Sequence, residues 1–336
     1  MMWQCPRCGG ELTRTAADAI RCGRCCHDHP VIGDIPDLRV PGPSWVDHER
    51  DRAEAKDLLQ RFSNSSAAAL VHAVFRARAG WTDARARART DEVLNAPTLL
   101  AEQLSGWLRP AAGTSGRLLD LGCGPGMLLA ALGAGRPTIG IDVSLVWLVV
   151  ARQFILEHGA EPALAAAMGE AVPLADGSVG SVVSLDVVEH VASPAAYLRE
   201  IDRVLQPNGR VALSTPNRFS LGAEPHVGVW GVGWLPRRWQ APFVEFRSGQ
   251  PYDSVALLSA RELRRLFARN TSCECRIVAP PISDTALAHF PPYRRRLGRV
   301  YNAVSGSSIG QWAGRVVGPY YQVTGQKRPA AFTSTR

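Results

Sequence analysis

Between residues 117 and about 215 the chain alternates short apolar runs with longer segments of helical composition. Apolar runs of this length predict buried strands, and the segments between them predict helices. Such alternation is typical of a parallel sheet covered by helices on both faces. The predicted strands are RLLDL (117–121), PTIGIDV (137–143), PALAAAM (162–168), SVVSLD (181–186) and GRVALST (209–215), with CRIVAP (275–280) and YYQVTGQK (320–327) as final strands.

Several residues mark where helices start and stop. Pro194 suits a first helical turn, and Gly159 suits a helix stop. Ser259 and Glu262 have the spacing of a capping box. The predicted helices are MLLAALGAG (127–135), LVWLVVARQFILEHG (145–159), PAAYLREIDRVLQPNG (194–209) and SARELRRLFAR (259–269).

The flanking regions differ in composition. Residues 1–40 are Cys-rich and loop-like, PGPS at 41–44 predicts a linker, and Ala, Arg and Leu dominate from 45 to 110, where Pro110 closes a helical linker or cap. Residues 216–240 are dense in Gly, Pro and Trp, which predicts an ordered loop over a site. The expected organisation is a small domain at 1–40, a helical segment at 45–110 and an α/β domain at 111–330, with covering elements at 216–258 and 281–318.

The net charge of +8 comes almost wholly from arginine, because Lys56 and Lys327 are the two lysines of the chain. An Arg-rich, Lys-poor chain is typical of a GC-rich genome, so the charge does not select among nucleic acid, a membrane surface and an acidic small molecule. The most apolar run, 145–156, is broken by Arg152 and Gln153, and the N-terminus is unlike a signal peptide. We therefore expect no membrane span and a cytoplasmic protein.

The stretch LLDLGCGPGM (118–127) places three glycines directly after a predicted strand. Glycine there makes a tight turn or lets a ligand approach the main chain. A dinucleotide fingerprint would need its third glycine at Met127, and a Walker-type loop would need a following Gly-Lys-Ser/Thr. A tight turn without any ligand is the simpler alternative.

The pattern Asp120-x-Gly122-x-Gly124-x-Gly126 resembles the first motif of class I S-adenosylmethionine-dependent methyltransferases, where the loop lies under the methionine part of the cofactor. The resemblance implies a Rossmann-like fold with a mostly parallel seven-stranded sheet. It also implies that Asp142, at the end of the second strand, accepts hydrogen bonds from both ribose hydroxyls. The alternative for Asp142 is a helix cap.

Two further stretches extend the resemblance. Residues 169–179 are similar to the family's adenine-contacting segment, and 182–217, with Glu189-His190-Val191, look like the ubiquinone-biosynthesis type of methyltransferase. The family's acid for adenine N6 is replaced by Met168 or Gly169, so adenine recognition is expected to use backbone atoms and Glu170. The implied cofactor-binding residues are Asp120, Gly122, Cys123, Gly124, Gly126, Asp142, Val143, Gly169, Glu170 and Asp186.

Five of the eight cysteines fall within the first 26 residues. Two C-x2-C pairs, Cys5 with Cys8 and Cys22 with Cys25, have the spacing of a structural zinc site with four thiolates. Reduced thiols without a metal are the alternative, and Cys26, His27 and His29 leave room for an exchange of one ligand. The stretch also resembles the zinc-ribbon subunit that activates several tRNA, rRNA and release-factor methyltransferases, which implies a ribbon packed on the catalytic domain. The alternative is that the ribbon only stabilises the fold and does not contact the substrate.

A base is useful when the methyl acceptor is a hydroxyl. The candidates are His226, on the predicted loop, and His190; a loop bystander and a structural residue are their respective alternatives. The loop's Trp230, Trp234 and Trp239 could form a wall of an apolar pocket or only pack the loop down.

The residues after the fourth predicted strand bear on the acceptor. Residues 185–188 read Leu-Asp-Val-Val, without the Asn/Asp-Pro-Pro-aromatic motif of many base methyltransferases. This favours a small-molecule or lipid-like acceptor and O-methylation. The alternatives are an RNA methyltransferase that uses the ribbon for RNA contact, and a catalytically retired binding module. The basic run at 291–302 could meet an anionic substrate or a membrane, or form a solvated helix face.

Overall fold

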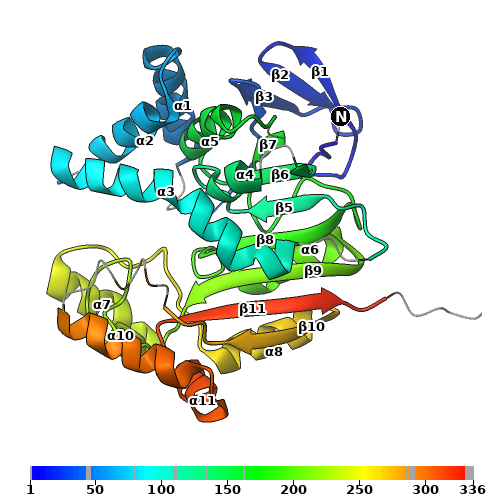
Figure 1. The fold of residues 1–336 in the computed structure, drawn as a ribbon. Coiled ribbons are helices and arrows are strands. Elements are labelled where there is room, and N and C mark those ends of the chain that lie inside the picture. Colours follow the sequence, from blue (N-terminus) through cyan, green and yellow to red (C-terminus); the bar gives the residue numbers. More distant parts are fainter. Residues whose placement is uncertain are drawn as a thin grey trace, which may run out of the picture.

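The computed structural model describes residues 2–42, 47–78, 80–108, 112–132, 135–161, 163–282, 284, 287 and 292–329. Its centre is a seven-stranded sheet in the order β10-β11-β9-β8-β5-β6-β7 (Figure 1). Strands β5 to β9 are parallel, and β11 runs antiparallel to both of its neighbours. The strands are β5 (Leu118–Leu121), β6 (Thr138–Asp142), β7 (Ala163–Ala166), β8 (Val179–Leu185), β9 (Leu205–Pro216), β10 (Cys273–Val278) and β11 (Tyr320–Lys327).

Helices cover both faces of this sheet. On one face lie α4 (Met127–Leu132) and α5 (Leu145–Glu157); on the other lie α6 (Pro194–Val204) and α8 (Ala260–Asn270). The predicted capping box is present, because Ser259 Oγ accepts from Glu262 N and Glu262 Oε2 accepts from Ser259 N. All predicted strands and the presence of these four helices are confirmed. The helix predicted for 194–209 is too long, however, because α6 ends at Val204 and residues 205–209 begin β9. The fold is the class I methyltransferase type that the resemblance implied.

The segment predicted as a helical cap forms α1 (His48–Arg61), α2 (Ala67–Arg76) and α3 (Asp83–Leu108). Helices α1 and α2 pack against α5, and α3 packs against α4. This second layer explains why most of α5 is apolar, since seven of its residues are buried between the sheet and α1 and α2. Pro110, predicted to close the segment, lies outside the described residues.

The N-terminal unit is a small antiparallel sheet in the order β1-β2-β3-β4. Its strands are β1 (Leu12–Ala16), β2 (Ala19–Cys22), β3 (Asp28–Ile32) and β4 (Ile35–Pro36). It sits at the β7 edge of the large sheet, where Asp37 bridges Ala166 and Leu38 N donates to Ala166 O (2.8 Å). Trp3, Ile20 and Leu38 belong to one apolar cluster with the core of the large sheet. This N-terminal unit (residues 3–38), called the ribbon below, is therefore packed on the edge of the large sheet.

The elements predicted to cover a site lie on the other side of the molecule, beyond β9 (Figure 1). The first, which we call the lid (residues 216–258), holds a short 3-10 helix η2 (Val232–Trp234) and α7 (Arg237–Ser248). Helix α7 corrects the prediction of a loop to residue 240. The sequence did not indicate this helix, because it contains Pro242 and has no side-chain cap. The second element holds α10 (Pro292–Ser305) and α11 (Ser308–Val317), between β10 and β11.

Candidate active site

The glycine turn after β5 lies against the carboxyl end of β6. Gly122 N and Cys123 N both donate to Ile141 O, at 2.7 and 3.0 Å. Gly122 has φ +86°, and a Cβ there would lie 2.2 Å from Val187 Cγ2, so only glycine fits. A Cβ on Gly124 would meet no atom within 4 Å. The turn is therefore packed from behind and open at Gly124, where a ligand can approach the backbone.

Asp142 ends β6 beside this opening. Its Oδ2 accepts from Gly124 N (2.8 Å) and its Oδ1 from Ser144 N (2.9 Å). Each oxygen of a carboxylate can accept more than one hydrogen bond, so both still have acceptor capacity toward a ligand. Burial raises the pKa of Asp142, and the two backbone amides partly offset that shift. The side chain is thus fixed where an acid for two vicinal hydroxyls was predicted.

Two predicted residues lie deeper in the turn. Asp120 is 3% exposed, and burial together with the charge of Asp142 raises its pKa to about 8. The Cys123 thiol is also buried, and burial raises its pKa. A protonated Asp120 suits a position behind the glycine turn, since two ionised carboxylates this close would repel each other.

The loop after β7 packs closely against the start of α6. A Cβ on Gly169 would lie 2.6 Å from the ring of Tyr197, so the backbone passes directly over that ring. Glu170 Oε1 accepts from Ser193 N (3.2 Å), which directs this carboxylate to the start of α6. Glu170 therefore has a structural partner, and its predicted contact with adenine stays a prediction.

A second group of polar residues lies at the ends of β8 and β9. Ser214 Oγ donates to Asp186 Oδ1 (2.8 Å), and Thr215 Oγ1 donates to Glu189 Oε2 (2.9 Å). Glu189 is 1% exposed, and burial followed by the charge of Asp186 raises its pKa to about 7. Its other oxygen, Oε1, is buried without a hydrogen-bond partner in the described residues.

Both predicted histidines join this group. The rings of His190 and His226 meet edge to face with centroids 4.7 Å apart. A ligand atom of Glu189 lies within 4.8 Å of one from each histidine, so the three residues could hold a metal ion or share protons. The sequence therefore named two members of one cluster that are 36 positions apart in the chain.

Glu224 orients His226. Its Oε1 lies 2.6 Å from His226 Nδ1, and its Oε2 accepts from the backbone amides of His226 and Val227, both at 2.8 Å. Burial lowers the pKa of His226, but the hydrogen bond and charge of Glu224 outweigh it and raise the pKa above its usual value. With Nδ1 protonated toward Glu224, the neutral ring has its acceptor at Nε2.

Sequence reasoning missed Glu224 and the role of Glu189. The signal that could have indicated Glu224 is its position two residues before the candidate base His226, in the stretch EPHVGVWG. Nothing in the local pattern showed that the lid histidine would meet the loop after β8. The backbone makes this meeting possible, since Ala256 N donates to Glu189 O (2.7 Å) and His190 Nδ1 lies 3.2 Å from Ser254 O.

A buried ion network ties the N-terminal segment to the end of β6. Arg39 has a side chain 1% exposed and donates to both oxygens of Asp37, to Asp51 (2.6 Å) and to Val143 O (2.9 Å). Asp51 in turn accepts from Leu145 N (2.8 Å) and caps α5. Burial alone would raise the pKa of Asp37, but its bonds to Arg39 and Arg52 hold it below its usual value.

The four predicted cysteines form one cluster in the ribbon. The Sγ atoms of Cys5, Cys8, Cys22 and Cys25 all lie within 4.8 Å of one another, with Cys5–Cys25 at 3.7 Å and Cys8–Cys22 at 3.5 Å. Tetrahedral zinc with Zn–S bonds of about 2.3 Å places its sulfurs about 3.8 Å apart. Cys26 is exposed and stands outside the cluster.

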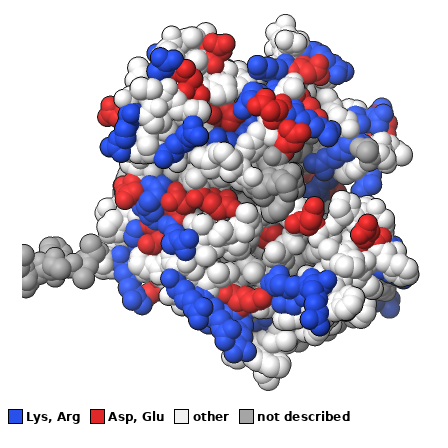
Figure 2. All heavy atoms as spheres, turned by 180° about the vertical axis from the view of Figure 1, so that it is seen from behind, with Lys and Arg blue, Asp and Glu red and all other residues white. Residues whose placement is uncertain are grey.

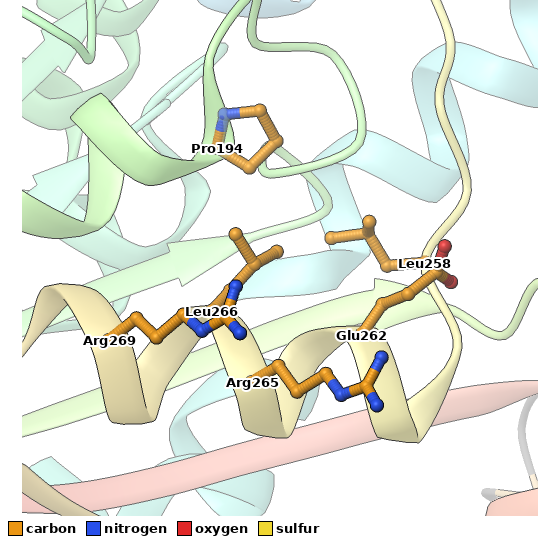
Figure 3. Close-up of a pocket in the computed structure, with 6 residues that line it drawn as sticks. All are labelled: Pro194, Leu258, Glu262, Arg265, Leu266 and Arg269. Carbon is orange, nitrogen blue, oxygen red and sulfur yellow. The ribbon is translucent and has the colours of Figure 1, made fainter.

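A further hollow of about 330 Å³ lies outside these groups. Figure 3 shows Glu262, Arg265 and Arg269 on α8 below Pro194 and Leu258. Figure 2 shows the molecule from behind: basic side chains dominate the lower edge of this rear face, and side chains of both charges lie above them. None of the residues around the hollow is a predicted site residue.

The tryptophans of the lid were predicted to form a wall of an apolar pocket or to pack the loop down. They do not enclose a pocket, since Trp230, Trp234 and Trp239 are 66%, 48% and 57% exposed.

The strand order, the glycine turn and the acid after β6 together define a class I methyltransferase fold. In agreement, the family described as "Methyltransferase domain" matches residues 119–213, so the chain carries a methyltransferase domain. It is 38% identical over 118 residues to the ubiquinone biosynthesis O-methyltransferase of Pseudomonas aeruginosa PAO1, covering 33% of this chain and 50% of that protein. For the Ruegeria pomeroyi enzyme of the same name the identity is 39% over 139 residues, covering 38% and 52%.

The chain thus spans about half the length of the curated relatives it matches. Among solved structures, a possible histamine N-methyltransferase from Thermotoga maritima is 17% identical, with a TM-score of 0.45 and coverage of 77% of this chain and 100% of that one. A complex of the Haloferax volcanii Trm112 methyltransferase activator with a methyltransferase matches with 16% identity, a TM-score of 0.42 and coverage of 69% and 93%.

Proposed function

We propose that the protein transfers a methyl group from S-adenosylmethionine to a hydroxyl group of a small-molecule or lipid-like acceptor. The observation that carries this proposal is that two groups lie at the same carboxyl edge of the sheet, where the neighbouring parallel strands β6, β5, β8 and β9 end. One is the open turn at Gly124 with Asp142, and the other is the Glu224–His226 pair with Glu189. The relatives named as O-methyltransferases support the choice of oxygen as acceptor.

The cofactor would lie along the ends of β5, β6 and β7. Gly124 gives the methionine part access to the backbone, and Asp142 accepts from the ribose hydroxyls. His48 is a further candidate for the adenine side, since its buried Nε2 has no hydrogen-bond partner in the described residues. A Cβ on Gly42 would lie 3.5 Å from that nitrogen and 3.2 Å from Met168 Cε. Burial lowers the pKa of His48, so its neutral ring could accept from an amine.

When bound, S-adenosylmethionine supplies an electrophilic methyl group on a sulfonium, which is displaced in line. The chain's own residues align the acceptor and move its proton. His226 Nε2 would take the proton that the acceptor hydroxyl loses when its oxygen is methylated. Glu224 holds the ring in orientation and stabilises the imidazolium that forms, in the general arrangement of a base with an orienting carboxylate.

For the cysteine cluster we propose a structural zinc ion. Cys5, Cys8, Cys22 and Cys25 would fill its four positions and leave none open for chemistry. The fit rests on the sulfur spacing and on Gly10, where a Cβ would lie 2.8 Å from Cys22 Sγ and 3.3 Å from Cys8 Sγ. Side chains are thus excluded from the space next to the sulfurs.

Calorimetric titration of S-adenosylmethionine tests the cofactor assignment. We expect the wild-type protein to bind it, and Asp142→Ala to bind it about 100-fold more weakly, because two charge-assisted hydrogen bonds to the ribose are lost. Asp28→Ala, an exposed acid of the ribbon, is the control and is expected to bind like wild type. Equal affinity of wild type and Asp142→Ala would show that Asp142 does not bind the cofactor. If wild type does not bind S-adenosylmethionine at all, the alternative of a catalytically retired module is favoured.

Transfer of labelled methyl groups from S-adenosylmethionine tests the acceptor class. We expect label in organic-extractable material from cells, and its absence in the same reaction with Asp142→Ala. Label recovered in RNA would instead support the RNA methyltransferase alternative. An RNA enzyme would also retain RNA with a steep dependence on salt.

The pH dependence of this transfer tests the base. His226 acts only when neutral, so the rate should fall as the pH falls through its raised pKa. Glu224→Gln removes the charge that raises this pKa, so the acid limb should move to lower pH. His226→Gln should lower the plateau about 100-fold. Glu245→Gln, the same change at an exposed position on α7, should leave the profile in place. An unmoved acid limb in Glu224→Gln would contradict the pairing.

A further inference from the structure

Helices α10 and α11 carry their apolar residues on the outside. On α10 the exposed positions Tyr293, Leu297, Val300 and Val304 recur at helical spacing and form one stripe. On α11, Ile309, Trp312 and Val316 do the same, with Ile309 80% and Trp312 63% exposed. Twelve of the fourteen large apolar residues exposed in the described structure lie in these helices or in the lid.

The inner faces of the two helices are polar or small. Asn302 exchanges hydrogen bonds with the backbone of Ile282 (2.7 and 2.8 Å), and Gln311 Nε2 donates to Ala279 O (3.0 Å). The helices approach the rest of the chain most closely at Gly298 and Gly314. A Cβ at these positions would lie 2.3 Å from Leu287 Cδ2 and 2.5 Å from Ala279 Cβ, respectively. A surface helix in water has the opposite arrangement, with its apolar stripe toward the core. The polar side is already used inside, so the apolar stripe faces outward.

The charged residues within these two helices are all basic. Residues 292–317 contain five arginines and no Asp or Glu, and from residue 285 to 336 there is no acidic residue at all. Arg296 and Arg299 are exposed on α10 beside the stripe. A second copy of the chain would bring the same arginines against this face, which opposes a symmetric dimer. An apolar stripe bordered by arginines instead matches an anionic bilayer, with the stripe in the acyl region and the arginines at the head groups.

The lid continues this surface. Leu221 N donates to Val317 O (3.2 Å), which joins the start of the lid to the end of α11. The indole nitrogens of Trp230 and Trp234 donate to the backbone oxygens of Leu221 and Ser220, while their rings stay exposed. Tryptophans placed this way are typical of membrane interfaces. Among the described residues, the helices are all too short or too polar to cross a bilayer, so the contact would be with one surface.

We propose that α10, α11 and the lid form a docking surface for membranes that contain anionic lipids. Helices α10 and α11 would lie in the plane of the interface, with Leu297 and Trp312 buried in lipid and Arg296 and Arg299 at the phosphates. The lid also carries His226, so the proposed docking surface includes the segment that holds the candidate base. The docking itself is independent of methyl transfer.

Co-sedimentation of the full chain with vesicles tests the proposal. We expect binding to vesicles of phosphatidylcholine mixed with phosphatidylglycerol, weaker binding to phosphatidylcholine alone, and weakening by salt. Arg296→Gln with Arg299→Gln should reduce the partition coefficient roughly fivefold for each arginine removed. Leu297→Ser with Trp312→Ser should abolish binding to both kinds of vesicle.

The controls repeat these changes elsewhere. Arg50→Gln with Arg61→Gln removes two exposed arginines from α1, and Leu156→Ser removes an exposed apolar residue from α5. Both controls should bind vesicles like wild type. Unchanged binding by the face variants, or no binding of wild type to the anionic vesicles, would overturn the proposal. So would a wild-type dimer in sedimentation equilibrium that Leu297→Ser with Trp312→Ser converts to monomer, because a second copy would then cover the face.

Discussion

Replacing Cys22 by Ser is expected to release the metal from the ribbon and to unfold residues 3–36, while the parallel sheet stays folded. A structural zinc site stabilises small domains by about 10–16 kcal/mol, more than a unit of this size can obtain from its own core. Cys22 is fully buried at the centre of the cluster, so serine leaves three thiolates and a weak fourth ligand. Metal analysis should give one zinc per wild-type chain and much less in the variant.

Cys26→Ser is the matched control for this experiment. Cys26 is exposed, has φ +54° and lies next to the cluster without belonging to it. Its replacement should change neither the zinc content nor the hydrogen exchange of β1–β3. If Cys26→Ser loses its zinc, the ligand exchange left open by the sequence is the correct assignment. If wild type holds no metal, the four thiols are only a reduced cluster.

The parallel sheet could be read from the sequence because its signals are local. A buried strand, the three glycines and the acid 20 positions after Gly122 each depend on neighbouring residues, and the structure places them as expected. The capping box of α8 was equally readable, because both members lie within one helical turn. The C-x2-C pairs predicted a cluster for the same reason, and its four sulfurs do converge.

The rest depends on contacts between distant segments. His190 and His226 were each named, but their meeting with Glu189 follows from how the lid folds back over β8 and β9. Helices α10 and α11 looked like an ordinary basic insertion, since composition does not show which face turns inward. Helix α7 was read partly as loop because Pro242 and the neighbouring glycines weigh against a helix locally, whereas Val244 packs it into the lid's own apolar cluster.

The ion network of Arg39 is the longest of these connections, and its removal is expected to be costly. Arg39→Met should lower the free energy of unfolding by about 3–5 kcal/mol, because Asp37 and Asp51 would then keep buried negative charges with fewer partners. Urea denaturation measures this change. Arg50→Met on α1 is the control, since its side chain is 76% exposed and surface pairs contribute about 0–1 kcal/mol.

The same variant should also weaken the binding of S-adenosylmethionine. Arg39 holds Val143 O and, through Asp51, the first turn of α5, so it fixes the backbone directly after Asp142. Without it, the acid proposed for the ribose hydroxyls is less firmly positioned. We expect affinity to fall in Arg39→Met while Asp142 itself is intact, and Arg39→Lys to restore only part of it, since lysine cannot make the bidentate contact with Asp37. A destabilised variant with unchanged affinity would restrict this network to a structural role and separate the N-terminal segment from the cofactor site.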